Sequence, residues 1–379
     1  MRGHIRKRGD SYCYVIDVGR GSNGRRKQQW KSGFRTKKEA EAALAAAMRA
    51  VNTGDHVARS SVKYGSYVLD QWLPGRENDL RPSTFASYTG NLTGHVVPAI
   101  GHRPLQELTP ADLNALYGSL LRAKDQGGTG LAPKTVRYIH TTVRKSLADA
   151  QRWGLVNRNV ADLANPPKVK RAMDHVTWSA EEAGAFLDFV ADDDLYALWH
   201  LALHTGMRRG ELLGSRWSDM DPSQGLLAVR QTVVSVAYEI QFGTPKTAKG
   251  RREIALDSET VLVLTRHRKE LEARGTDTHT KAALLFPGSD GTALHPQLVS
   301  DRFNRLVERS GLPRIRLHDL RHTHATLALA ARVNPKIVSE RLGHSTVAFT
   351  MDVYSHALPS MQQEAAEAVA GLIAPGRRP

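Results

Sequence analysis

The N-terminal segment alternates between apolar and polar side chains in the manner of β-strands. Every second residue from 12 to 18 is aromatic or aliphatic, namely Tyr12, Tyr14, Ile16 and Val18. A turn rich in Gly and Asn follows at residues 19–24, and a second strand-like run continues to Phe34. The pattern predicts a small sheet whose apolar residues share one face.

A helix is expected to pack against this sheet. Thr36 and Glu39 have the spacing of a capping box, and they precede an Ala-rich stretch that ends near Gly54. A disordered basic tail is the alternative interpretation of this segment, but disordered tails lack aromatic residues at a regular period of two. We therefore interpret residues 1–60 as a first domain.

The pattern changes to a helical one between residues 61 and 164. Thr109 and Pro110 are typical of a helix start, and Pro133 opens a further helix. In that second helix the apolar residues recur at intervals of three and four, as Val136, Ile139, Val143, Leu147 and Ala150. This stretch is predicted to be a helical second domain.

Residues 165–175 are interpreted as a linker, because Asn165-Pro166-Pro167 cannot continue a helix. Ser179 and Glu182 form another capping box and begin the third domain, residues 176–379. A strand-rich stretch runs from Leu226 to Leu256, and helical patterns resume at Asp257. The predicted fold is multidomain and mainly α, with a small N-terminal sheet and a small antiparallel sheet in the third domain.

The charge of the chain indicates a polyanionic partner. The formal net charge is +15, and residues 1–38 hold twelve Lys or Arg side chains against Asp10 and Asp17. No apolar run approaches the roughly 20 residues of a membrane span, and the first residues lack the apolar core of a signal peptide. Cys13 is the only cysteine, which excludes a disulfide framework. We expect a cytoplasmic protein that binds DNA or RNA.

The C-terminal half carries cations where a metal-dependent phosphodiesterase would carry a carboxylate cluster. Displacement at phosphorus adds negative charge to the non-bridging oxygens, so fixed cations are needed there. Arg208 follows Gly206, which ends a helix, and Glu211 is three residues on and can hold the guanidinium. Taken alone, such an arginine is more often a helix cap.

A second group of candidate residues follows in the run HDLRHTHA. His318 and Arg321 are three residues apart, so on a helix they can reach one phosphate together. His318 and His322 also have the spacing of a zinc-binding helix. That motif requires Glu beside the first histidine, whereas this chain has Asp319, so zinc is disfavoured.

The run HDLRHTHA is preceded by TGMRRGELLGSRW and PKTAKGRR and followed by LGH, and Tyr354 lies ten residues after this last motif. The catalytic half resembles the tyrosine recombinase (phage integrase) family in order and spacing. The middle and N-terminal segments look like that family's core-binding and arm-binding domains, on weaker motifs. One departure is Ser215, where an apolar residue is usual; it is expected to affect packing and not chemistry.

The resemblance implies a role for each residue of the set. Arg208 and Arg321 would bind the non-bridging oxygens, and His344 would add a third hydrogen bond. His318 would assist proton movement, Lys246 would protonate the departing 5′ oxygen, and Glu211 would orient Arg208. Tyr354 would form a 3′-phosphotyrosine that stores the bond energy, so neither a metal, another cofactor nor ATP is needed.

DNA attachment sites and other copies of the chain are the partners that the resemblance implies. The family acts as tetramers on two sites, and residues 361–373 are a candidate for packing on a neighbouring protomer or on their own domain. An excision-directing or DNA-bending helper protein is a further partner to consider. The basic residues expected to contact DNA are Arg6, Lys7, Arg25, Arg26, Lys134, Arg137 and Arg144.

Two other functions remain open at this point. Type IB topoisomerases resemble this chemistry but relax DNA without exchanging partners, and the LGH motif with the arm-like domain favours recombination. A non-catalytic DNA-binding regulator would leave the complete catalytic set unexplained. The bases of the attachment site are not readable from the sequence.

Overall fold

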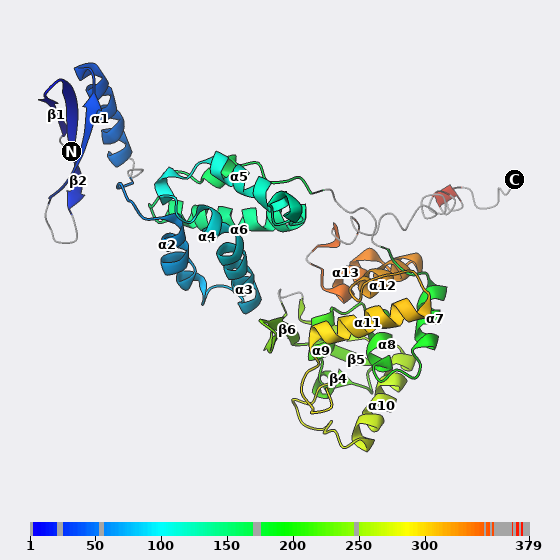
Figure 1. Ribbon diagram of the computed structural model, residues 1–379. Helices are drawn as coiled ribbons and strands as arrows, with labels where there is room; N and C mark the ends of the chain where they lie inside the picture. The colour runs from blue at the N-terminus through cyan, green and yellow to red at the C-terminus, as the bar shows by residue number, and fades with distance from the viewer. Residues whose placement is uncertain are drawn as a thin grey trace. The chain divides into compact units, whose positions relative to one another are not determined.

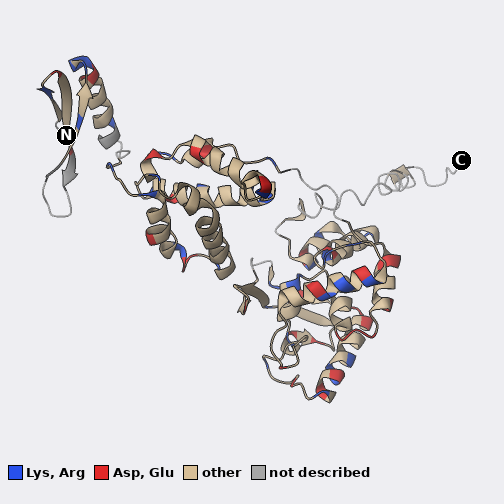
Figure 2. Cartoon of the chain, viewed as in Figure 1, with Lys and Arg blue, Asp and Glu red and all other residues tan. Residues whose placement is uncertain are grey.

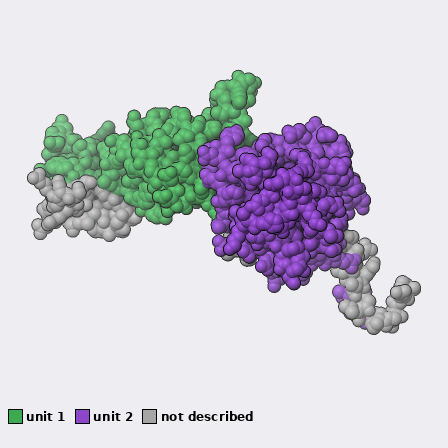
Figure 3. Space-filling view, turned by 90° about the horizontal axis from the view of Figure 1, so that it is seen from below, with its two compact units in different colours: residues 1–171 green, residues 172–379 purple. Residues whose placement is uncertain are grey.

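The computed structural model describes residues 3–20, 26–52, 57–169, 176–245, 250–344 and 346–348, with single residues 351, 366, 369, 370 and 373. Contacts divide the chain into two compact units, residues 1–171 and residues 172–379 (Figure 3).

The N-terminal part of the first unit is a three-stranded antiparallel sheet with one helix. The strands are β1 (Gly3–Arg8), β2 (Ser11–Arg20) and β3 (Arg26–Phe34), in the order β1-β2-β3, followed by α1 (Lys37–Asn52) (Figure 1). The predicted sheet and helix are therefore confirmed, and β1 is an addition to them. The Thr36 hydroxyl caps α1 at the Glu39 amide, 3.2 Å away. The Glu39 carboxylate, however, accepts from the Arg35 amide at 3.0 Å and not from that of Thr36.

The prediction of one apolar face on β2 was incomplete. Tyr14 and Ile16 are buried, but Cys13 and Val15 on the opposite face are buried as well. β2 is the central strand, and α1 covers the face of Ile16, since a Cβ built on its partner Gly3 would lie 2.6 Å from Leu44 Cδ1.

The remainder of the first unit is helical, as predicted. Its helices are α2 (Tyr64–Ser66), α3 (Pro82–Asn91), α4 (Val97–Ile100), α5 (Pro110–Leu121) and α6 (Pro133–Arg152), linked by short π and 3₁₀ turns at Tyr67–Trp72, Pro74–Arg76, Leu92–Val96, Leu105–Glu107, Lys124–Gln126 and Val160–Leu163. Thr109 caps α5 through the Asp112 amide. The apolar stripe predicted on α6 is buried at all five positions.

The second unit is also mainly helical. It contains α7 (Ala180–Phe189), α8 (Tyr196–Thr205), α9 (Arg209–Gly214), a 3₁₀ turn (Trp217–Asp219), α10 (Ser258–Ala273), α11 (Pro296–Ser310), α12 (Asp319–Ala330) and α13 (Pro335–Leu342). The Ser179–Glu182 capping box is present at the start of α7. Trp178, Phe186, Trp199 and Phe303 pack together in the core. Charged residues of both signs mark the outer face of α11 (Figure 2).

The strand-rich stretch of this unit forms two small antiparallel sheets where one was expected. The first consists of β4 (Met220–Asp221), β5 (Leu226–Val229) and β8 (Arg252–Ala255) in the order β4-β5-β8. The second is the hairpin of β6 (Thr232–Val236) and β7 (Glu239–Gly243). Within the described residues these two strands pair only with each other, and positive φ angles at Ala237 and Tyr238 make the turn.

Candidate active site

The LGH motif forms the C-terminal cap of α13. Gly343 has a φ of +67°, a left-handed conformation that favours glycine. Its amide donates to the Glu340 carbonyl at 2.9 Å, and the His344 amide donates to the Ser339 carbonyl at 2.9 Å. This pair of hydrogen bonds is the Schellman motif, which reverses the chain at the helix end. The motif therefore places His344 immediately beyond the last turn of α13.

Three successive carbonyls at this helix end each accept a hydrogen bond from a different arginine. The Arg341 carbonyl accepts from Arg252 Nε at 2.6 Å, and the Leu342 carbonyl accepts from Arg321 Nη2 at 2.7 Å. The Gly343 carbonyl accepts from Arg208 Nη2 at 3.2 Å. A helix C-terminus carries partial negative charge and unpaired carbonyls, so it attracts and orients cations. The end of α13 thus gathers Arg208, Arg252 and Arg321 from distant parts of the sequence, and these three residues form the arginine cluster.

Arg208 is the most accessible of these guanidinium groups. Gly206 ends α8 with a φ of +62°, and Arg208 then caps α9. Its side chain is 41 % exposed and donates from Nη1 to Glu211 Oε1 at 2.8 Å. The predicted pairing of Arg208 with Glu211 is present, so one face of the guanidinium is held by protein while the side chain still reaches solvent.

Glu211 is buried and bridges two arginines. Its second oxygen accepts from Arg252 Nη2 at 2.9 Å. Burial opposes ionisation of this carboxyl, but the hydrogen bond and charge of Arg252, followed by the charge of Arg208, outweigh it and lower the pKa. The buried Ser215 hydroxyl donates to the Glu211 carbonyl at 2.9 Å, which satisfies the polar residue that departs from the family pattern.

Arg321, in contrast to Arg208, is only 3 % exposed. Its Nη1 donates to the Gly206 carbonyl at 2.8 Å, while its Nη2 holds Leu342. The turns at the ends of α8 and α13 are tightly packed around it, because a Cβ at Gly206 would lie 2.6 Å from Leu342 Cδ2. Arg321 therefore ties these two turns together.

The two candidate histidines differ in exposure. His344 is buried, and burial together with the charges of Arg321 and Arg208 lowers its pKa to about 3. His318 precedes α12 and is exposed; desolvation and then the Arg321 charge lower its pKa. Both rings are thus neutral near pH 7, and a neutral imidazole can both donate and accept a proton.

The zinc hypothesis gains no support from the geometry at His318. The rings of His318 and His322 meet edge to face, with centroids 5.4 Å apart. Asp319, the neighbouring carboxylate, accepts two hydrogen bonds from the Arg316 guanidinium at 2.8 and 2.9 Å. Within the described ranges, no cluster of three His, Cys, Asp or Glu side chains suits a metal ion.

Lys246 and Tyr354 lie outside the described residues, as does Arg25. The structure brings together Arg208, Glu211, His318, Arg321 and His344, and the roles given to all these residues stay predictions.

Two residues of the site were missed. Arg252 stands in the motif PKTAKGRR and Arg341 precedes LGH, yet neither was given a role from the sequence.

The buried histidines should make the second unit sensitive to acid. Burial, then the neighbouring His204, lowers the pKa of His200 to about 4, as the site lowers that of His344 to about 3. An unfolded histidine titrates near pH 6.5, so between there and about pH 4 only the unfolded chain takes up these protons. The free energy of unfolding should therefore decrease as the pH is lowered through this window, by about 1.4 kcal/mol per pH unit for each ring.

Urea unfolding at a series of pH values between about 7.5 and 5 measures this effect. His200→Phe is the informative variant, because His200 is 1 % exposed and lies outside the arginine cluster. The slope of the free energy of unfolding against pH should be smaller in this variant than in wild type, by about the contribution of one proton. An unchanged slope would contradict the assignment.

Comparison with known proteins places this geometry in a family. The model of the phage integrase family matches residues 179–361, which include the whole arginine cluster. The model of an arm DNA-binding domain matches residues 4–47, and that of the N-terminal SAM-like domain of phage integrases matches residues 66–121.

Similar proteins include a tyrosine recombinase XerC-like protein of Caldanaerobacter subterraneus, 24% identical over 96% of this chain and 97% of its own length. The ICEBs1 integrase of Bacillus subtilis is 25% identical over 81% of this chain and 82% of its own length. Among solved structures, the Tn1549 transposon integrase in complex with a circular intermediate DNA is similar in fold, with a TM-score of 0.69 and 20% identity over 81% of this chain and 99% of its own. The chain belongs to the tyrosine recombinase (phage integrase) family and is a DNA strand transferase.

Proposed function

We propose that this chain is a site-specific recombinase that integrates or excises a phage or mobile element through a 3′-phosphotyrosine on Tyr354. The observation that carries the proposal is the cluster of Arg208, Arg321 and His344 around the end of α13. A phosphate that binds beside Arg208 would meet fixed cations, and Glu211, the carboxylate that Arg208 contacts, is already paired with Arg208 and Arg252. Such an arrangement stabilises the charge that develops at phosphorus.

The proposed reaction balances without an external energy source. The Tyr354 oxygen attacks phosphorus, the bond between phosphorus and the 5′ oxygen breaks, and Lys246 gives that oxygen a proton. Arg208, Arg321 and His344 hold the non-bridging oxygens, and His318 assists the proton of the tyrosine. A 5′ hydroxyl of the partner strand then attacks the phosphotyrosine in the reverse sense, so the number of phosphodiester bonds is conserved.

We propose a division of labour between three domains, residues 1–60, 61–164 and 176–379, with a linker at 165–175. In the first domain, the Arg6 guanidinium stacks on the exposed Trp30 at 5.4 Å. That pair and the exposed Lys7 provide cationic and aromatic surface for DNA beyond the core site. Arg26 belongs to β3, and its side chain lies outside the described set.

The middle domain would contact the core site through the basic face of α6. Lys134, Arg137 and Arg144 are exposed on this helix. Arg144 also pairs with the exposed Asp162 at 2.5 Å, and Arg137 donates to the Pro167 carbonyl at 3.4 Å. Exposed pairs of this kind are weak and exchange readily for phosphate contacts.

Assembly to a tetramer on two DNA sites is part of the proposal. A lambda integrase tetramer bound to a Holliday junction has a similar fold, with a TM-score of 0.57 and 18% identity over 92% of this chain. Most of residues 361–373, the candidate for packing between protomers, lie outside the described residues. No helix in the part of the chain that the structure describes has the length and apolarity to cross a membrane. We place the reaction in the cytoplasm, with an excision-directing or DNA-bending helper protein as a further candidate partner.

A recombination assay on the DNA that flanks the gene tests the proposal against its alternatives. Exchange of partners between two attachment sites is expected, in EDTA and without ATP, because cations of the protein replace a metal. Relaxation of supercoils without exchange would favour a topoisomerase, and binding without any cleavage would favour a regulator. A clear loss of cleavage in EDTA would revive metal catalysis.

Removal of the first domain should separate assembly from chemistry. A truncated protein that begins at Ser61 should cleave a nicked core-site duplex but fail to recombine full attachment sites. Its affinity should depend less steeply on salt, since each lost phosphate contact removes about 0.9 from the slope of log affinity against log salt. Full recombination by the truncated protein at low salt or high concentration would contradict an arm-binding role.

A further inference from the structure

Arg341 makes three hydrogen bonds to three different elements, although its side chain does not reach into the arginine cluster. Its Nη1 donates to the Ala255 carbonyl at the end of β8, at 2.8 Å, and its Nη2 donates to the His204 carbonyl in α8 at 2.9 Å. Its Nε faces His324 Nε2 on α12 at 3.4 Å. One guanidinium therefore fastens the last turn of α13 to β8, α8 and α12.

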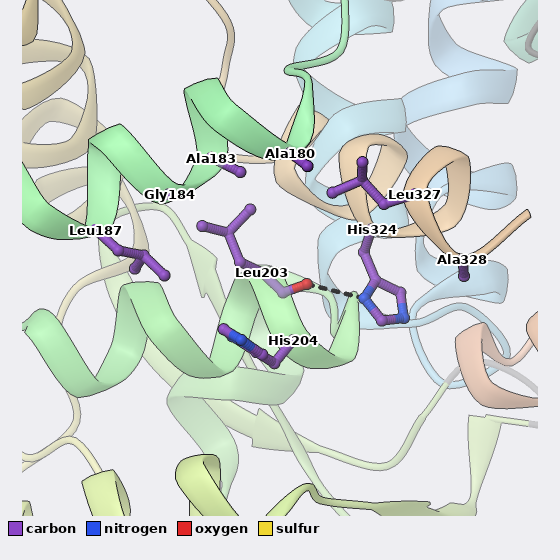
Figure 4. Close-up of a pocket in the computed structure, with 9 residues that line it drawn as sticks. All are labelled: Ala180, Ala183, Gly184, Leu187, Leu203, His204, His324, Leu327 and Ala328. Atoms are coloured by element: carbon purple, nitrogen blue, oxygen red, sulfur yellow. Dashed lines mark hydrogen bonds between the residues drawn. The ribbon is translucent and has the colours of Figure 1, made fainter. Parts of the chain in front are cut away.

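His324 takes part in this hydrogen-bond network as a neutral ring. Figure 4 shows it pointing from α12 toward the last turn of α8, where its Nδ1 bonds to the Leu203 carbonyl at 2.8 Å. Since a carbonyl only accepts, Nδ1 carries the proton and Nε2 is left to accept from Arg341. Burial and the Arg341 charge lower the pKa of His324 to about 4, which keeps this tautomer neutral near pH 7.

The backbone carbonyl of Arg341 is the first of the three successive carbonyls that orient the arginines of the active site. The Arg341 carbonyl holds Arg252, which in turn donates to Glu211, the partner of Arg208. The next two carbonyls hold Arg321 and Arg208 directly. A shift of the last turn of α13 would thus displace both arginines assigned to the phosphate.

We propose that Arg341 is a positioning residue for strand cleavage, which sets the last turn of α13 so that Arg208 and Arg321 meet the scissile phosphate correctly. This inference rests on the proposed function. The alternative is a purely structural role, in which Arg341 stabilises the fold without any selective effect on the phosphate. The two roles differ in one respect. A positioning residue acts through Arg208 and Arg321, so its loss slows cleavage only as far as these arginines stabilise charge on the non-bridging oxygens. A purely structural residue affects cleavage regardless of that charge.

A methylphosphonate at the scissile position tests this difference, because a neutral methyl group replaces one charged non-bridging oxygen. Single-turnover cleavage by the full-length protein is compared on phosphate and methylphosphonate core sites for wild type and Arg341→Gln. On phosphate, Arg341→Gln should be slower by about 100-fold, the scale of a misplacement near 1 Å. On methylphosphonate the same variant should be slower by less than about 10-fold, because less charge is left to stabilise. The Kd for the core site should be nearly unchanged.

Arg268→Gln is the matched control. Arg268 is also a partly buried structural arginine, with bonds to Thr278 and His279, but it lies on α10 outside the arginine cluster. Its variant should slow both substrates equally, if at all. Should Arg341→Gln fail to fold, Arg341→Lys gives the same comparison with a milder defect, since one ammonium cannot span three acceptors.

The outcomes separate the two hypotheses. A defect in the Arg341 variants that is equal on both substrates, or a rate equal to that of wild type, would overturn the positioning role alone. Wild-type protein that cleaves neither substrate would overturn the proposed function and the inference with it. A defect confined to the charged phosphate supports both.

Discussion

Replacement of Tyr354 by phenylalanine is expected to abolish strand cleavage while site-specific DNA binding is kept. The ring remains and only the nucleophilic oxygen is lost, so the contacts that bind DNA are preserved. In a comparable covalent enzyme, removal of the nucleophile costs on the order of 10⁶ in kcat. The measurement is the accumulation of covalent protein–DNA complex on a nicked suicide duplex, beside an electrophoretic binding assay.

Tyr196→Phe serves as the control for this prediction. Tyr196 begins α8, outside the arginine cluster, so its variant should form the covalent complex at the wild-type rate. Covalent complex with the Tyr354 variant would remove the nucleophile from the account. Loss of binding in that variant would show that the tyrosine acts in recognition and not in chemistry.

The second large effect is expected from Arg208→Lys and Arg321→Lys. A lysine is a point charge that cannot reproduce the planar fork of a guanidinium. Arg208 must contact Glu211 and the Gly343 carbonyl while it faces solvent, and Arg321 must bridge the Gly206 and Leu342 carbonyls. The loss of one transition-state donor costs roughly 2.7–4 kcal/mol in oxyanion sites, which is about 10²–10³ in the rate of cleavage.

Single-turnover cleavage of the core site measures this loss, with thermal unfolding as the check on folding. Arg208→Lys is the cleaner variant, because its side chain is partly exposed whereas Arg321 is buried. Arg268→Lys on α10 should cleave at nearly the wild-type rate. Cleavage near that rate by Arg208→Lys or Arg321→Lys would mean that the phosphate binds elsewhere.

Features that depend on neighbours in the sequence could be predicted from it. The caps at Thr109 and Ser179 and the buried stripe of α6 follow from local spacing, and the structure confirms them. The pairing of Arg208 with Glu211 is of the same kind, since one helical turn separates them. The family motifs added the remaining candidate residues, because their order and spacing are specific together.

Features that depend on the end of α13 could not be predicted. Arg252 and Arg208 reach this end from 89 and 135 residues away, through backbone carbonyls that any residue type supplies. No side-chain pattern marks such a contact, so Arg252 and Arg341 were given no role. The second small sheet was missed for a related reason: strand patterns indicate strands but not which of them pair.

The phosphotyrosine chemistry is tested by identifying the residue that becomes linked to DNA. Wild-type protein is incubated with a nicked core-site duplex in EDTA, the covalent complex is digested with protease and nuclease, and the modified peptide is sequenced by mass spectrometry. We expect a nucleotide attached through its 3′ phosphate to Tyr354. A nucleotide on any other residue, or one attached through a 5′ phosphate, would contradict it.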